Sequence, residues 1–383
     1  MLKVGAIGMG RRLTCGVTAS LLRLGEDVQV TAIADPNPEY SKGFMKAYHI
    51  PIEPARFYPS AEEMLRTEKN LDGIMIGTRC YLHPEMMRLA AQANIPVFLE
   101  KPVFIDEKGK EILKNLQSVH EAPVEVSFPL RMTQPAQLAR DIVRSGVLGR
   151  IAQVEAINTP PYGEHYFKKW NREDALTGGL FMQKATHDLD IIFFLTDSVP
   201  LTVCAMESRN VFGGDMPKGS TCDTCEKLYT CKESHWMLEN RFHESPQPHT
   251  CVFSKDVEIH DAGSVLLQLS NGAHASYAQC FTGRRGAALR LTRIVGFNAT
   301  LELEFVSGEV RVFHHHSGRV DRYQFKEAEG HFGGDEALMN AFVKLMRGER
   351  TEYPDLRDGR ISASACLAAK RSAQTEKFVK VEW

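Results

Sequence analysis

Three things are missing from this sequence of 383 residues, and each absence excludes a class of protein. No apolar run approaches the ~20 residues that cross a bilayer, so no transmembrane helix is predicted. The 46 lysines and arginines nearly balance the 48 aspartates and glutamates, so nucleic acid and anionic membranes are not expected partners. The first residues enter a strand-like pattern without a cleavable signal region, which predicts a cytoplasmic protein.

The composition is that of a soluble globular protein, with 43% hydrophobic and 25% charged residues. At ~100–200 residues per domain, the length predicts two domains. Four of the nine cysteines fall within one stretch of thirty residues, a cluster that needs its own explanation.

The chain opens with a strand, a glycine turn and a helix. Residues 3–7 form the predicted strand, Gly8-Met9-Gly10 follow, and a second apolar strand over 28–34 ends at Asp35. In such a unit the glycines let the backbone approach a pyrophosphate, while the acid accepts hydrogen bonds from the ribose hydroxyls. Leu13 stands where a third glycine is usual, so a glycine turn that binds nothing is the alternative interpretation.

Asp35 also indicates which dinucleotide would bind. A carboxylate at this position repels the 2′-phosphate of NADP, so NAD is favoured. Arg11 and Arg12 add positive charge nearby and leave NADP as the second choice.

The strand and helix pattern then repeats. A strand over residues 71–76 ends in Gly77-Thr78, and a helix over 84–93 leads to a strand over 95–99. That strand delivers Glu100-Lys101-Pro102 at its carboxyl end, where open parallel sheets place their ligands. The first domain is predicted to close near residue 122.

Several of these segments together resemble the Gfo/Idh/MocA family of nicotinamide-dependent oxidoreductases. The glycine turn, Asp35, His83-Pro84 and above all Glu100-Lys101-Pro102 carry the likeness in the first domain. In the second half, the segment from Gln183 to Asp190 looks like the family's active-site helix. The resemblance implies an α/β fold: a doubly wound Rossmann domain over 1–122 with a parallel sheet, then an α/β domain over 123–383 with a large, mostly antiparallel open sheet. A C-terminal helix is expected to return to the Rossmann domain.

The resemblance also implies a cofactor and a reaction. The residues expected to contact NAD are Gly8, Met9, Gly10, Arg11, Arg12, Asp35, Thr78, His83, Glu100 and Lys101. Lys101 matches the lysine that holds the substrate oxygen, and His187 matches the catalytic histidine, which we expect to act as a general base. Asp190, on the same helix face, is expected to orient the imidazole or contact substrate.

Two residues depart from the family pattern. Many members carry an acid where this chain has Gln183, which can hydrogen-bond a substrate but cannot relay protons, and Lys184 adds a second cation. The leading hypothesis is therefore an NAD-dependent oxidoreductase acting on a secondary hydroxyl of a sugar, polyol or related carbohydrate. An NAD-dependent glycoside hydrolase or lyase that works by transient oxidation and elimination is the alternative, and a non-catalytic nucleotide-binding regulator is a third.

Further substrate contacts are predicted from residue type and position. Tyr162, His165 and Trp170 lie in a loop before the active-site helix, where aromatic and polar groups suit a sugar ring, although packing against the loop's own sheet explains them as well. Arg131 follows the strand between the domains and is a further candidate. The family's exposed sheet face suggests a homodimer or homotetramer.

The cysteine cluster lies in a predicted insertion over about 209–255, which is rich in glycine and proline. Cys222, Cys225, Cys231 and Cys251 have the paired spacing that recurs in tetrahedral zinc sites. A structural zinc ion is the first choice, an iron–sulfur cluster the second, and free or disulfide-paired thiols the third.

Overall fold

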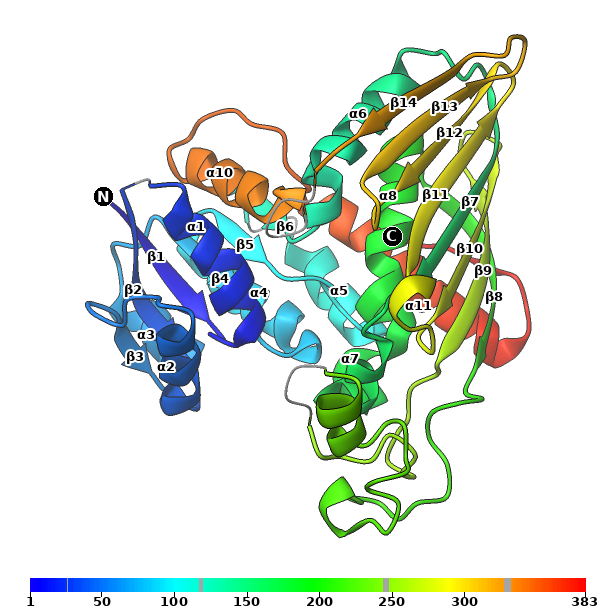
Figure 1. Cartoon of the computed structure of the whole chain (residues 1–383). Helices are drawn as coiled ribbons and strands as arrows, with labels where there is room; N and C mark the ends of the chain where they lie inside the picture. Colours follow the sequence, from blue (N-terminus) through cyan, green and yellow to red (C-terminus); the bar gives the residue numbers. More distant parts are fainter. Residues whose placement is uncertain (26, 117–119, 244–247, 327–331) are drawn as a thin grey trace.

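The computed structural model describes residues 1–25, 27–116, 120–243, 248–326 and 332–383, which form two β-sheets with helices packed around them (Figure 1). The smaller sheet is built from the first third of the chain and the larger sheet from the remainder. The α/β class and the two kinds of sheet expected from the sequence are confirmed.

The first sheet has six parallel strands in the order β3-β2-β1-β4-β5-β6. Its strands are β1 (Leu2–Ile7), β2 (Val28–Ala34), β3 (Arg56–Tyr58), β4 (Gly73–Ile76), β5 (Val97–Leu99) and β6 (Val124–Val126). Ile7 pairs with Ala34 on one side and Ile76 on the other, so three strands end at one edge of the sheet. In this doubly wound order, the segments that follow the strands lie together at the carboxyl edge of the sheet.

Short helices connect these strands. They are a π-helix η1 (Arg12–Thr18), α1 (Ala19–Arg23), α2 (Pro38–Ala47), α3 (Ala61–Thr67), the 3-10 helices η2 (Cys80–Leu82) and η3 (Ala91–Ala93), α4 (His83–Ala90) and α5 (Glu107–Leu116). Residues 117–119, which follow α5, lie outside the described part of the chain.

The first domain extends further than the sequence suggested. The boundary was predicted near residue 122, yet β6 pairs with β5 and completes the parallel sheet. The nucleotide domain therefore includes this strand.

The second sheet has nine strands in the order β14-β13-β12-β11-β7-β10-β9-β8-β15. Its strands are β7 (Ile151–Thr159), β8 (Pro200–Ser208), β9 (Ala262–Leu269), β10 (His274–Cys280), β11 (Leu289–Gly296), β12 (Ala299–Glu304), β13 (Glu309–His314), β14 (Val320–Gln324) and β15 (Val379–Lys380). Among the described strands of this second sheet, only β7 and β10 pair in parallel, so the sheet is mostly antiparallel as expected.

Helices lie against one face of this sheet (Figure 1). The helical segments of this half of the chain include the 3-10 helix η4 (Pro129–Met132), α6 (Gln134–Arg144), the 3-10 helices η5 (Gly163–Phe167) and η6 (Trp170–Arg172), α7 (Asp174–Thr177), a π-helix η7 (Phe181–Ala185), α8 (Thr186–Thr196) and α11 (Leu356–Thr375). A further helix, α10 (Gly334–Met346), packs on the first domain instead. Almost every residue of α8 is buried. A helix that is apolar all round in this way belongs to the core.

The last two long helices connect the halves of the molecule. Leu338 and Phe342 of α10 pack in the same apolar cluster as Val4 and Val30 of the first sheet, so this helix covers the nucleotide domain. Before α11 begins, the Pro354 carbonyl accepts a hydrogen bond of 2.7 Å from the amide of Val126 in β6. The C-terminal segment thus lies against the edge of the Rossmann sheet.

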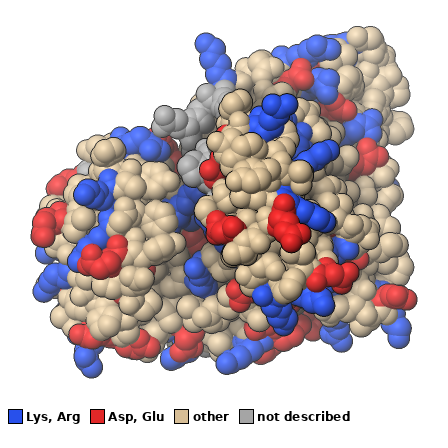
Figure 2. All heavy atoms as spheres, turned by 60° about the horizontal axis from the view of Figure 1, so that its bottom comes forward, with Lys and Arg blue, Asp and Glu red and all other residues tan. Residues whose placement is uncertain are grey.

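The surface agrees with the balanced charge of the sequence. Figure 2 shows acidic and basic side chains interspersed over one face, with no broad field of one sign. Within the described residues, no helix combines the length and apolar character that crossing a membrane requires.

Candidate active site

The glycine turn after β1 has the backbone shape that a dinucleotide site needs. Gly8 adopts φ +80°, and a Cβ there would meet Thr78 at 2.7 Å, so a side chain is excluded for two reasons. A Cβ on Gly10 would have no described atom within 4 Å, which leaves open space beside the turn. The Met9 amide donates to the Asp35 carboxylate at 3.1 Å and fixes that carboxylate next to the turn. These residues fit a bound dinucleotide.

Two residues expected at the cofactor make other contacts. The Arg12 guanidinium donates to Glu100 at 3.1 Å and also binds Asp335 of α10, while Glu100 accepts a second hydrogen bond from Ser127. Arg12 therefore joins α10 to the end of β5, which its position after the glycine turn did not indicate. Arg11 is exposed.

His83 holds two loops of the site together. Its Nδ1 lies 2.7 Å from the Pro102 carbonyl oxygen, and its Nε2 lies 3.1 Å from that of Thr78. Burial lowers the pKa of His83. The histidine predicted near the cofactor thus bridges the segments that follow β4 and β5.

Lys101 lies at the end of β5 and faces the second domain. Its Nζ donates to the carbonyl oxygen of Gln183 in η7 at 2.6 Å. Burial, and then the positive charge of Lys184, lower the pKa of Lys101 to about 8. An ammonium group with a pKa this close to neutrality can stabilise a developing oxyanion and can also give up its proton.

His187 lies in the first turn of α8, the helix that continues from η7. Its ring packs edge-on to Phe128, with 6.0 Å between the ring centroids. Because Gln183 lies one helical turn earlier, the hydrogen bond from Lys101 brings the predicted lysine and the predicted histidine helix together.

Asp190 is paired with a buried arginine. It was expected to orient His187 or contact substrate, but its carboxylate accepts hydrogen bonds from Arg131, one of them at 2.9 Å. Arg131, a predicted substrate contact, is buried between Asp190 and Asp358. This pair joins η4 to α8 and α11, so both residues are committed to the fold.

Other predicted substrate residues also have protein partners. The Gln183 amide exchanges hydrogen bonds of 2.9 and 3.0 Å with Asn171. The Trp170 ring stacks on the Arg79 guanidinium, 3.9 Å from its centroid. His165 lies 3.2 Å from the carboxylate of Glu164.

Tyr162 and Lys184 form a contact within the predicted site. Lys184 is buried in η7, and its Nζ donates to the Tyr162 hydroxyl oxygen at 3.1 Å. Lys184 lowers the pKa of Tyr162, while burial raises the pKa of Tyr166. Burial lowers the pKa of Lys184, but Tyr162 and Tyr166 raise it by more. The pKa is therefore raised overall, and the amine stays protonated.

The sequence did not point to Asp188, which lies between α8 and the large sheet. Asp188 accepts hydrogen bonds from Arg290 at 2.7 Å, and from Asn158 and Tyr277 at 2.8 Å each. The only local signal was a charged residue next to His187, at the start of a helix whose later turns are apolar. The partner strands β7, β10 and β11 are too distant in sequence to be inferred.

The insertion brings two of the four cysteines side by side through its backbone. The Cys222 amide donates to the His249 carbonyl at 2.7 Å, and the Cys251 amide donates to the Ser220 carbonyl at 2.9 Å. Cys225 closes a turn with Cys222. All four thiols are free, and residues 244–247 of the insertion lie outside the described chain.

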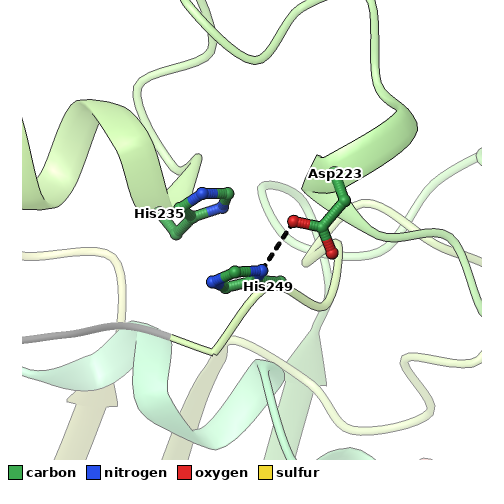
Figure 3. Close-up of side chains that lie close together, drawn as sticks. All are labelled: Asp223, His235 and His249. Atoms are coloured by element: carbon green, nitrogen blue, oxygen red, sulfur yellow. Dashed lines mark hydrogen bonds and ion pairs between the residues drawn. The ribbon is translucent and has the colours of Figure 1, made fainter.

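A different trio in the insertion has its ligand atoms closest together. Among the described residues, Asp223, His235 and His249 form the one group of potential metal ligands whose atoms all lie within 4.8 Å, and none of the cysteines belongs to it (Figure 3). His249 Nδ1 lies 2.6 Å from Asp223, and the two imidazoles are stacked 3.7 Å apart at 9°. The in-plane lone pairs of the two stacked rings lie in separate, nearly parallel planes, so they do not converge on one ion.

Comparison with known proteins matches both halves of the chain. Residues 2–128 match the NAD-binding Rossmann fold of the Gfo/Idh/MocA oxidoreductase family, and residues 136–302 match the Gfo/Idh/MocA C-terminal domain. The Bacillus subtilis protein YteT, which carries an oxidoreductase name, is 24% identical over 358 residues, covering 83% of this chain and 82% of its own.

Two further proteins carry more specific names. The inositol 2-dehydrogenase of Rhizobium meliloti is 23% identical over 205 residues, 53% of this chain and 57% of its own. A levoglucosan dehydrogenase in complex with NADH and levoglucosan shares the fold, with a TM-score of 0.77, 17% identity and 100% of both chains covered.

Proposed function

Because this chain belongs to the Gfo/Idh/MocA family of oxidoreductases, we propose that it oxidises a secondary hydroxyl of a sugar, polyol or related carbohydrate with NAD. The observation that carries the proposal is the hydrogen bond between Lys101 and Gln183. It sets the ammonium group at the end of the nucleotide-binding sheet against the helix that bears His187. The named dehydrogenases of inositol and levoglucosan support the substrate class.

Each part of the reaction then has a residue. When bound, NAD supplies the acceptor for the hydride that leaves the carbinol carbon. Lys101 holds the substrate oxygen and stabilises its negative charge as the O–H bond breaks, and His187 accepts that proton as the carbonyl forms. In the reverse direction His187 returns the proton.

Asp35 supports NAD rather than NADP as the partner. Its carboxylate is held by the amides of Met9 and Asn37, at the end of the strand next to the glycine turn. A fixed negative charge there accepts hydrogen bonds from ribose hydroxyls and repels a 2′-phosphate.

The proposal is tested by product analysis. Purified protein, with its bound nucleotide identified, is incubated with NAD⁺ and a panel of sugars, polyols and glycosides, and both NADH and the oxidised product are quantified. Equal amounts of NADH and ketone support the proposal. Sugar released from a glycoside without NADH accumulation contradicts it in favour of redox-assisted glycoside cleavage.

For the insertion we propose a structural zinc ion bound by Cys222, Cys225, Cys231 and Cys251. The backbone pairing of the segments that carry Cys222 and Cys251 supports it, as does the turn between Cys222 and Cys225. Binding requires the four thiol side chains to turn toward one point, since they do not form a tight group in this structure. Four thiolates leave no open position for catalysis.

We also propose that the outer face of the large sheet contacts a second copy of the chain. Met206 of β8 and Leu266 of β9 lie on neighbouring strands and are 74% and 53% exposed. Adjacent exposed apolar side chains of this size favour association. Light scattering after gel filtration measures the number of copies, and a monomer at all concentrations contradicts this proposal.

A further inference from the structure

A buried lysine in the proposed active site has no acidic partner. Lys184 is only 6% exposed, and its Nζ forms no ion pair with a carboxylate in the part of the chain that the structure describes. Its neighbours are the rings of Tyr162 and Tyr166, with Nζ 5.3 and 5.8 Å from their centroids. An ammonium group buried without a counter-ion is costly, and proteins usually pair such a charge.

Neighbouring groups add positive charge to the same place. Lys101 and Lys184 act on each other, since the charge of Lys184 contributes to the low pKa of Lys101. Arg290 donates through Nε to Asp188, but its Nη2 is buried and has no hydrogen-bond partner among the described residues. A buried donor left unpaired in this way indicates a missing acceptor.

Tyr162 contributes one more donor. Its hydroxyl oxygen accepts from Lys184, so the hydroxyl proton is left to donate, and no described residue accepts it. Tyr162 is 42% exposed, so the residue remains accessible from solvent. The positive charges of Lys184 and Arg290 both lower the pKa of Tyr162.

We propose that Lys184, Arg290 and Tyr162 form a subsite for a carboxylate of the substrate, which makes the preferred substrate a sugar acid such as a hexuronate or hexonate. The inference rests on the proposed oxidoreductase function and specifies its substrate class. A carboxylate has two oxygens, enough to accept hydrogen bonds from Nζ of Lys184, Nη2 of Arg290 and the hydroxyl of Tyr162 together. A neutral sugar hydroxyl could accept only part of this set and would leave the charge uncompensated.

The test compares each acid with its neutral amide. Hexuronates and hexonates are assayed with NAD⁺ beside the matching uronamides and aldonamides, which keep the shape and lose the charge, and beside hexose 6-phosphates. We expect kcat/KM to be at least about tenfold higher for an acid than for its amide, because charge-assisted hydrogen bonds are lost. A higher kcat/KM for the phosphates than for the acids overturns the carboxylate assignment.

Variants assign the preference to the subsite. Lys184→Met is expected to reduce the acid-to-amide ratio of kcat/KM by about tenfold or more, with the effect mainly in KM, and Lys184→Arg to restore part of it. Lys168→Met removes another lysine that is 1% exposed and is the matched control, with the ratio expected to stay at the wild-type value. Tyr162→Phe removes only a hydroxyl and provides a second test if Lys184→Met does not fold.

Calorimetric titration of a hexuronate into the NADH-bound protein separates this inference from the proposed function. If the protein oxidises neutral and acidic sugars, and Lys184→Met leaves the acid-to-amide ratio of kcat/KM unchanged, the subsite is overturned and the oxidoreductase function stands. If the protein binds the hexuronate, Lys184→Met weakens this binding, and no substrate yields NADH, the subsite is supported and the oxidoreductase function is contradicted.

Discussion

Lys101 donates a hydrogen bond of 2.6 Å to the carbonyl oxygen of Gln183, and this bond joins the nucleotide-binding sheet to the helix that carries His187. Lys101 and Gln183 are far apart in sequence and belong to different domains, so the contact exists only in the folded chain. It brings an ammonium group of the first domain to the helix of the second domain that carries the imidazole.

Loss of either Lys101 or His187 is expected to abolish turnover while cofactor binding remains. Lys101→Met removes the charge that holds the substrate oxygen, and His187→Gln removes the base, so kcat should fall by about 10²–10⁴-fold in each. Steady-state kinetics measure the loss, and NADH fluorescence measures the retained binding. Lys110→Met, on the outer helix α5, is the matched control, and wild-type rates in both site variants would refute the assignment.

The activity should decline at alkaline pH. The pKa of Lys101 is about 8, so its protonated form is lost as pH rises through this value, and kcat/KM should fall there. Lys184 is one cause of the low pKa because its like charge disfavours the ammonium. Lys184→Met should therefore move the falling limb to higher pH, and a limb that stays in place would show that Lys101 does not cause it.

Asp35 is expected to determine the choice of dinucleotide. Asp35→Ser removes the charge that repels a 2′-phosphate, so the ratio of the Kd for NADP to that for NAD should fall by about tenfold or more. Fluorescence titration with both reduced dinucleotides measures it. Asp72→Ser removes a carboxylate that binds the Lys3 amide away from the turn and should leave the ratio unchanged. An unaltered ratio in Asp35→Ser contradicts the role.

The pair between Arg131 and Asp190 is expected to stabilise the fold. Asp190→Ala leaves the buried guanidinium with Asp358 alone, and the free energy of unfolding should drop by about 3–5 kcal/mol. Urea denaturation followed by circular dichroism gives the value. Asp141→Ala, an exposed acid on α6, should change it by less than about 0.5 kcal/mol. Equal effects of the two substitutions would argue against a structural role for the pair.

The insertion is expected to lose order with its metal. Elemental analysis should find about one zinc per chain, and Cys222→Ser or Cys251→Ser should release it and make the insertion sensitive to protease. Asp223→Asn should retain the zinc, because the stacked imidazoles beside it do not converge on an ion. Protein without zinc, or zinc lost only from Asp223→Asn, would show that the thiols do not bind it.

The parts of this account that the sequence predicted are those with local signals. Strand, glycine turn and strand ending in Asp35 all lie within one short segment, and apolar alternation defines the strands of the large sheet. Lys101 and His187 were predicted as site residues from motifs of the same local kind. A pattern inside one segment needs no knowledge of distant partners.

The remainder depends on contacts between distant segments. Asp190 shares a helix face with His187, yet a buried arginine from η4 offers its carboxylate a stronger partner. Arg12 was predicted at the cofactor because it follows the glycines, but Asp335, more than 300 residues later, accepts from it. Arg290 had no local signal at all, since its significance comes from the pairing of β11 with β7.

The central claim is that hydride leaves a carbinol carbon for NAD while Lys101 and His187 manage the oxygen and its proton. A substrate from the panel, carrying deuterium on the carbon to be oxidised, tests it most directly, with the recovered dinucleotide and product analysed by mass spectrometry after a single turnover. The account predicts one deuterium in NADH and a ketone in equal amount, with neither formed by Lys101→Met. Product formed without deuterium in NADH, or a deuterium transfer unaffected in Lys101→Met, would contradict it.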